Sequence, residues 1–113
     1  MSRKFPRPPE VPILRSNANL VPLWTLQELR QHVLETLCAH DCLDATRTPL
    51  HESVVRRSGR PCGLFFHVEG PRLLKSYAVW AADEHRVLFY DGAGSRFAET
   101  RLSGGPDWRE LAA

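Results

Sequence analysis

The sequence has few cysteines and no long hydrophobic run, and these two shortages exclude several classes of protein. Its three cysteines, Cys38, Cys42 and Cys62, are an odd number, whereas a secreted disulfide scaffold favours an even one. No stretch approaches the roughly 20 apolar residues that a membrane-spanning helix needs. The opening stretch MSRKFPRPPEVP lacks the apolar core of a signal peptide. We therefore expect a soluble, cytoplasmic protein with free thiols and no membrane partner.

An excess of charge of one sign is also missing. The 15 basic and 13 acidic residues leave a formal net charge of +2, which creates no strong field toward nucleic acid or anionic lipid. The hydrophobic fraction of 42% and the charged fraction of 25% are ordinary for a globular protein. We expect a flexible, basic, proline-rich tail over residues 1–12 and a single α+β domain over residues 13–113.

The clearest element in the sequence is an amphipathic helix over about residues 26–41. Thr25 is a good N-cap residue, and Glu28 three positions later completes the pattern of a capping box. Arg30 interrupts the apolar stripe of this helix. Either it extends along the margin with its charge in water, or it pairs with a carboxylate on a facing element. The apolar stripe, which should face a core, consists of Leu26, Leu29, Val33, Leu34, Leu37 and Cys38.

After the helix, the sequence changes to short β-rich runs separated by turn residues. The connections are short, which favours antiparallel hairpins in sequence order. The chain therefore predicts an N-terminal helix packed on an antiparallel meander sheet of four or five strands over about residues 50–103. Residues 107–113 would add a short C-terminal helical turn or a frayed end. Strands are expected at residues 50–57, 62–69, 73–82, 87–91 and 96–103.

The stretch CAHDC raises the question of a metal site. Cys38, His40 and Cys42 lie close together in sequence, and Cys62 or His51 would have to supply the fourth ligand of a tetrahedral zinc ion. On a helix, however, His40 points about 200° away from Cys38. We therefore expect Cys38 to extend the buried helix face and His40 to stabilise the helix C-terminus. Zinc bound by Cys38, His40, Cys42 and Cys62 stays an alternative, and no other cofactor is expected.

No constellation of catalytic residues is visible, and we expect no enzymatic activity. Cys62 and His67 are an odd number of positions apart on one expected strand, which puts their side chains on opposite faces. Cys38 and Cys42 lie near a helix C-terminus, where the dipole disfavours a thiolate nucleophile. The glycines of YDGAGSR at residues 90–96 suit a hairpin turn, because no helix follows them as in a phosphate-binding loop.

One face of the predicted sheet is more apolar than a solvent-exposed face should be. Leu64 and Phe66 alternate with Phe65 and His67, so the first pair can meet the helix and the second pair faces away. A sheet face open to water should be polar. Something should therefore cover it: residues 13–24, a second subunit or a ligand. The apolar residues that face away come from three neighbouring strands and are Phe65, Tyr77, Val79, Leu88 and Tyr90.

These five residues lead to the functional prediction. We expect a non-enzymatic binding or protein-interaction module that forms a homodimer, or binds a protein partner, through this face. The alternative is a single-stranded nucleic-acid binder, in which the three aromatic side chains of the face stack on bases and arginines such as Arg56, Arg57 and Arg86 contact phosphates. The modest net charge argues against nucleic acid, because such surfaces lie in a clearly basic groove.

Overall fold

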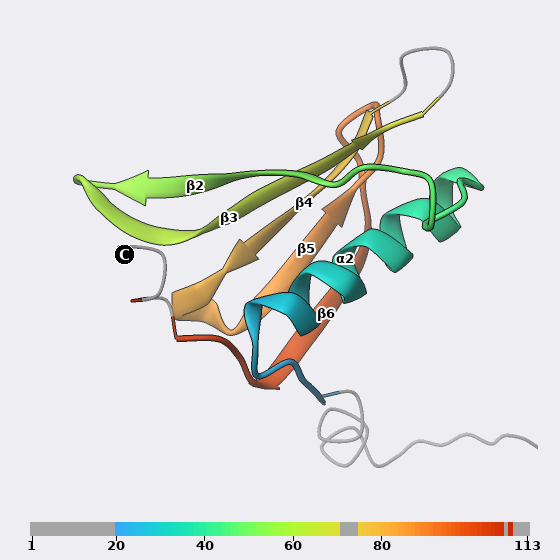
Figure 1. Cartoon of the computed structure of the whole chain (residues 1–113). Coiled ribbons are helices and arrows are strands. Elements are labelled where there is room, and N and C mark those ends of the chain that lie inside the picture. Colours follow the sequence, from blue (N-terminus) through green and yellow to red (C-terminus); the bar gives the residue numbers. More distant parts are fainter. Residues whose placement is uncertain (1–19, 71–74, 108, 110–113) are drawn as a thin grey trace, which may run out of the picture.

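A computed structural model of the protein describes residues 20–70, 75–107 and 109. In this part of the chain one long helix, α2 (Leu26–Asp41), lies across one face of a six-stranded sheet (Figure 1). The predicted helix and the predicted α+β class are therefore confirmed. The remaining elements are β1 (Leu20–Pro22), β2 (His51–Arg57), β3 (Arg60–Glu69), β4 (Lys75–Ala81), a short 3₁₀ helix η2 (Ala82–Glu84), β5 (Arg86–Tyr90) and β6 (Arg96–Gly104).

The sheet is mixed, with the strand order β1-β6-β5-β4-β3-β2. Strands β2 to β6 form the predicted antiparallel meander, because each pairs with the next along the chain. The prediction of a wholly antiparallel sheet with four or five strands is wrong, because β1 pairs in parallel with β6 as a sixth strand. This strand is three residues long, and so short a run shows no alternation that sequence analysis can recognise.

Four parts of the sequence prediction fall outside the described residues. They are the tail at residues 1–12, the segment at residues 13–19, the first two residues of the strand expected at residues 73–82 and most of the C-terminal turn at residues 107–113. Residues 13–24 were one expected cover of the second sheet face. Their described part, residues 20–24, does not lie over that face. β1 runs along the sheet edge beside β6, Leu23 is buried in the core, and Trp24 is 63% exposed.

The helix begins as its capping residues predict. Thr25 Oγ1 accepts a hydrogen bond from the backbone N–H of Glu28 at 3.0 Å, and Glu28 Oε1 accepts one from the backbone N–H of Thr25 at 3.0 Å. The helix ends where Cys42 takes a left-handed conformation with φ 59°. No helix in the described part of the chain has the length and apolarity needed to cross a membrane. The buried residues of the predicted stripe are Leu29, Val33, Leu37 and Cys38.

The core lies between α2 and one face of the sheet. Along β3, Leu64, Phe66 and Val68 are buried under the helix, whereas Phe65 and His67 are half-buried on the other face. This is the alternation that the sequence predicts. The same pattern continues on the neighbouring strands, whose buried core residues are Ala78, Trp80, Val87, Phe89 and Leu102.

Arg30 pairs with a facing carboxylate, so the second interpretation of this residue is confirmed. Its Nε donates to Glu52 Oε1 at 2.7 Å and its Nη2 donates to Glu52 Oε2 at 3.0 Å. The hydrogen bond to Glu52 raises the pKa of Arg30. This bidentate pair links α2 to the edge strand β2.

The hairpin between β2 and β3 contains a register shift. Its two-residue turn, Ser58 and Gly59, has positive φ at both positions, as a tight hairpin turn requires. Beside the turn Arg56 lies opposite Pro61, whereas one step further Val55 lies opposite Gly63. One residue of β3 therefore has no counterpart on β2, which makes this position a β-bulge. Proline lacks an N–H donor and is tolerated at such a site.

Candidate functional site

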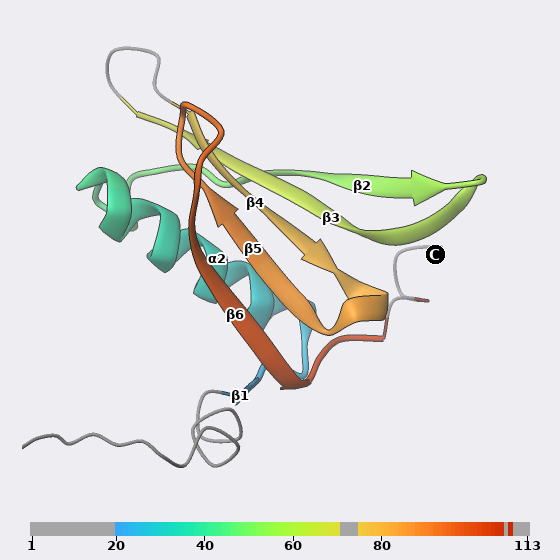
Figure 2. The ribbon, with the colours of Figure 1, turned by 180° about the vertical axis from the view of Figure 1, so that it is seen from behind.

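The sheet face opposite α2 is the candidate site, and we call it the open face. Figure 2 looks onto this face: strands β3 to β6 lie in front of α2, and no other described element lies in front of the strands. The structure places the five predicted residues of this face on adjacent positions of β3, β4 and β5. They are Phe65, Tyr77, Val79, Leu88 and Tyr90.

The register between the strands brings these five side chains together. Phe65 lies opposite Val79, Val79 lies opposite Leu88, and Tyr77 lies opposite Tyr90. The Tyr77 and Tyr90 rings stack with their centroids 4.9 Å apart and an interplanar angle of 14°. The Phe65 ring lies 5.5 Å from the Tyr77 ring, tilted by 30°. All five side chains are half-buried by their neighbours and form one continuous apolar patch.

At one end of the patch, near η2, charged side chains of both signs alternate. Arg86 Nη2 lies 2.6 Å from Glu84 Oε1, and Arg86 Nη1 lies 3.6 Å from Glu99 Oε2. Glu99 Oε2 also lies 3.2 Å from Arg101 Nε. The hydrogen bond to Glu84 raises the pKa of Arg86. Arg86, one of the three arginines that the nucleic-acid alternative assigns to phosphate, is thus already engaged by two carboxylates.

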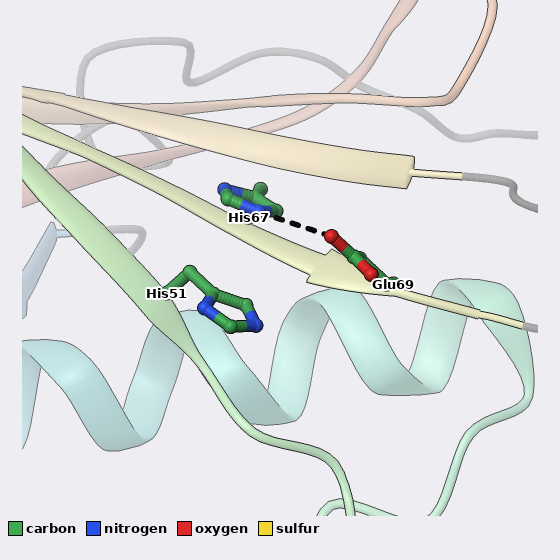
Figure 3. Close-up of side chains that lie close together, drawn as sticks. All are labelled: His51, His67 and Glu69. Atoms are coloured by element: carbon green, nitrogen blue, oxygen red, sulfur yellow. Dashed lines mark ion pairs between the residues drawn. The ribbon is translucent and has the colours of Figure 1, made fainter.

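The other end of the open face carries a group of titratable side chains (Figure 3). His51 on β2 lies directly opposite His67 on β3, and their rings stack with centroids 4.7 Å apart. Glu69 Oε2 lies 3.7 Å from His67 Nε2 and 3.6 Å from Lys75 Nζ. We call His51, His67 and Glu69 the His–Glu cluster, because their ligand atoms all lie within 4.8 Å of one another.

The four residues of the CAHDC alternative are not brought together. Cys38 is buried in the core and Cys42 ends the helix. His40 stacks on Phe97 with ring centroids 3.6 Å apart, and Cys62 lies on β3. Burial raises the pKa of the Cys38 thiol and so disfavours the thiolate that zinc binds. Within the described residues, the His–Glu cluster is the group of three or more side chains that is close enough to hold a metal ion.

Comparisons with known proteins identify no relative of this chain. No protein-family model matches it, and neither a curated protein nor a solved structure gives a significant match. The function is therefore argued from the chemistry of the open face.

Proposed function

We propose that the protein is a small, non-enzymatic interaction module that forms a homodimer through the open face. The observation that supports this proposal is the continuous patch of half-buried apolar side chains on β3, β4 and β5. Apolar patches larger than a few hundred Å² are uncommon on monomers and mark contact sites. Tyrosine is an efficient interface anchor because it buries a large area and has few rotatable bonds.

The charges around the patch favour a second copy of this chain as the partner. The end near η2 alternates two carboxylates with two guanidinium groups, and the other end pairs a carboxylate with an ammonium group. A two-fold contact places the same surface against itself. A rim of one sign would therefore repel its copy, whereas a rim that carries both signs at each end can complement itself.

The same surface argues against single-stranded nucleic acid. A phosphate backbone binds in a basic groove, whereas Arg86 already lies between Glu84 and Glu99. The rings of Tyr77 and Tyr90 stack on each other, and the Phe65 ring lies 5.5 Å from the Tyr77 ring, so these contacts leave less ring surface free for bases. A second copy of the chain uses the outer surface of this pair without separating it.

Tyr77→Glu tests the proposal, because Tyr77 lies on the middle strand of the patch and contacts the Phe65 and Tyr90 rings. In a dimer the new carboxylate would be buried without a partner, which is strongly unfavourable, whereas in a monomer it would face water. The wild type should therefore be a dimer and the variant a folded monomer. Sedimentation equilibrium over a concentration series measures the oligomeric state, and circular dichroism checks the fold.

Val54→Glu is the matched control for this experiment. Val54 is 38% exposed and lies opposite Leu64, on the side of the sheet that carries α2. The control introduces the same charge on the other face, so it should stay dimeric.

Two results would overturn the proposal. The first is a wild type that stays monomeric up to several hundred micromolar, and the second is a dimer that Tyr77→Glu leaves intact. A monomeric wild type whose affinity for oligonucleotides falls steeply with salt would in addition support the nucleic-acid alternative. If Tyr77→Glu unfolds the chain, a monomeric wild type would still overturn the proposal.

A further inference from the structure

We propose that His51, His67 and Glu69 form a binding site for one divalent transition-metal ion, such as zinc. Figure 3 shows the three side chains gathered on neighbouring strands, and their ligand atoms lie within 4.8 Å of one another. The ligand atoms of tetrahedral zinc lie roughly 3–3.5 Å apart, since each is about 2.0–2.2 Å from the metal. Closing the cluster around an ion therefore needs movements of about 1 Å.

The sheet holds the three ligands on one face whatever their rotamers. His51 and His67 are direct partners on antiparallel strands, where the Cβ atoms of opposite residues are about 4.5–5.5 Å apart. His67 and Glu69 are alternate residues of β3 and so point to the same side. The imidazole rings are now nearly parallel, with an interplanar angle of 15°. Rotation of these rings, without any backbone movement, would aim one nitrogen of each at a common ion.

The donor set selects the class of metal. Two imidazole nitrogens and one carboxylate oxygen suit zinc and the neighbouring transition metals, whereas calcium and magnesium prefer oxygen ligands. With three protein ligands, the fourth position would be taken by water or another small ligand. Because all three ligands belong to one chain, the site does not depend on the proposed dimer.

Lys75 opposes metal binding and provides a sharp test. It lies directly opposite Glu69 on β4, and its Nζ is 3.6 Å from Glu69 Oε2. Its ammonium group would repel a divalent ion at the cluster. Both side chains are more than half exposed, at 57% and 52%, so the pair is weak and a metal ion can displace it. Removing this charge should therefore strengthen binding.

The experiment titrates the full chain with zinc, followed by calorimetry, and with cobalt, followed by absorption. Wild type should bind one ion per chain. His51→Ala and His67→Ala should each weaken binding about tenfold or more, whereas Lys75→Gln should strengthen it several-fold. His85→Asn is the matched control, because His85 is exposed and distant along the chain, and asparagine tolerates its left-handed backbone with φ 55°. The control should bind like wild type.

Thiols are the main competing ligands, and the cobalt spectrum separates them from the cluster. Coordination by Cys42 or Cys62 would add a sulfur-to-cobalt charge-transfer band, which imidazole and carboxylate ligands lack. A wild type that binds neither ion, or binding that persists in His51→Ala with a thiolate band, would overturn the proposal. If a histidine variant fails to fold, Glu69→Gln at the exposed end of β3 replaces it and should weaken binding.

Sedimentation of the metal-free and the zinc-loaded protein keeps this test separate from that of the dimer. Zinc bound by a monomer with loss of affinity in His51→Ala would support the site even if the dimer proposal fails. A dimer that binds no zinc would support the dimer proposal and overturn the metal site.

Discussion

The two faces of the sheet carry large apolar side chains from the same strands, yet only one face is a core. Phe66 and Phe89 on the covered face have no exposed surface, and Trp80 is 1% exposed. Phe65 and Tyr90 on the open face are only half-buried. The difference is the layer above them: α2 covers one face, whereas the open-face rings contact mainly each other. Alternation along a strand thus decides which residues share a face, but burial requires a second layer.

The residue types on the two faces differ in the same sense. Beside Phe65, Val79 and Leu88, the open face carries tyrosine and histidine, which combine an apolar body with a polar tip and tolerate partial hydration. The covered face uses phenylalanine, tryptophan, leucine and valine, and its buried polar residue, Ser76, has a partner on α2. A face that mixes apolar residues with amphipathic aromatics can exist both alone in water and against a partner, which is what a reversible contact surface needs.

The largest expected contrast between the faces is in the cost of removing a leucine. Leu37→Ala on α2 should lower the free energy of unfolding by about 2–5 kcal/mol, because Leu37 is fully buried. Leu88→Ala on the half-buried open face should cost about 1 kcal/mol. Urea denaturation of dilute protein measures both values. Equal losses would mean that the open face is core as well.

A smaller contrast is expected for two serines. Ser76 is buried on the covered face and donates to Asp41 Oδ2 at 2.6 Å, so Ser76→Ala should cost about 1–3 kcal/mol. Ser53 is exposed and lies opposite Phe65 on the open face, so Ser53→Ala should change stability by less than about 0.5 kcal/mol. The same denaturation experiment compares the two. A neutral Ser76→Ala would show that this hydrogen bond contributes nothing net.

The smallest effect should appear in the pH dependence of stability. Burial lowers the pKa of His32, against a smaller opposing influence of Glu35, and His32 Nε2 lies 2.8 Å from Thr100 Oγ1. As the pH falls, His32 therefore takes up a proton at a higher pH in the unfolded chain than in the folded chain. Stability should be complete above the usual histidine pKa, near 6.5, and should fall as the pH drops below it. In His32→Gln this slope, measured by thermal unfolding from pH 7 to about pH 5, should be shallower. An unchanged slope would contradict the assignment.

Local signals made much of the fold predictable. The capping box of Thr25 and Glu28 and the stripe through Leu37 predicted the helix, because helix signals are contained within a few turns. Alternation along β3 predicted which face meets the helix. β1 was missed because its pairing joins Leu20 to Arg101, and such a long-range contact leaves no periodic pattern in the sequence.

The candidate site, like the fold, could be predicted from the sequence only in part. The apolar patch was predictable because each strand shows which of its residues share a face. The His–Glu cluster was not, because it also requires the register between two strands, and His51 begins a strand whose residues are almost all exposed. A histidine on each of two expected neighbouring strands was the available signal, but it does not say whether they meet.

The bulge in the β2–β3 hairpin decides which way β2 faces. If the ladder had continued in the register of Arg57 opposite Arg60, His51 would lie opposite Phe66 and would be directed at the core. Glu52 would then move to the open face, away from Arg30. The sequence of β2, HESVVRR, is not clearly more apolar on either side. Its composition alone therefore does not determine which side of β2 faces the core. One additional residue in the neighbouring strand therefore sets the odd or even phase of β2, and with it both an ion pair on one side and a histidine pair on the other.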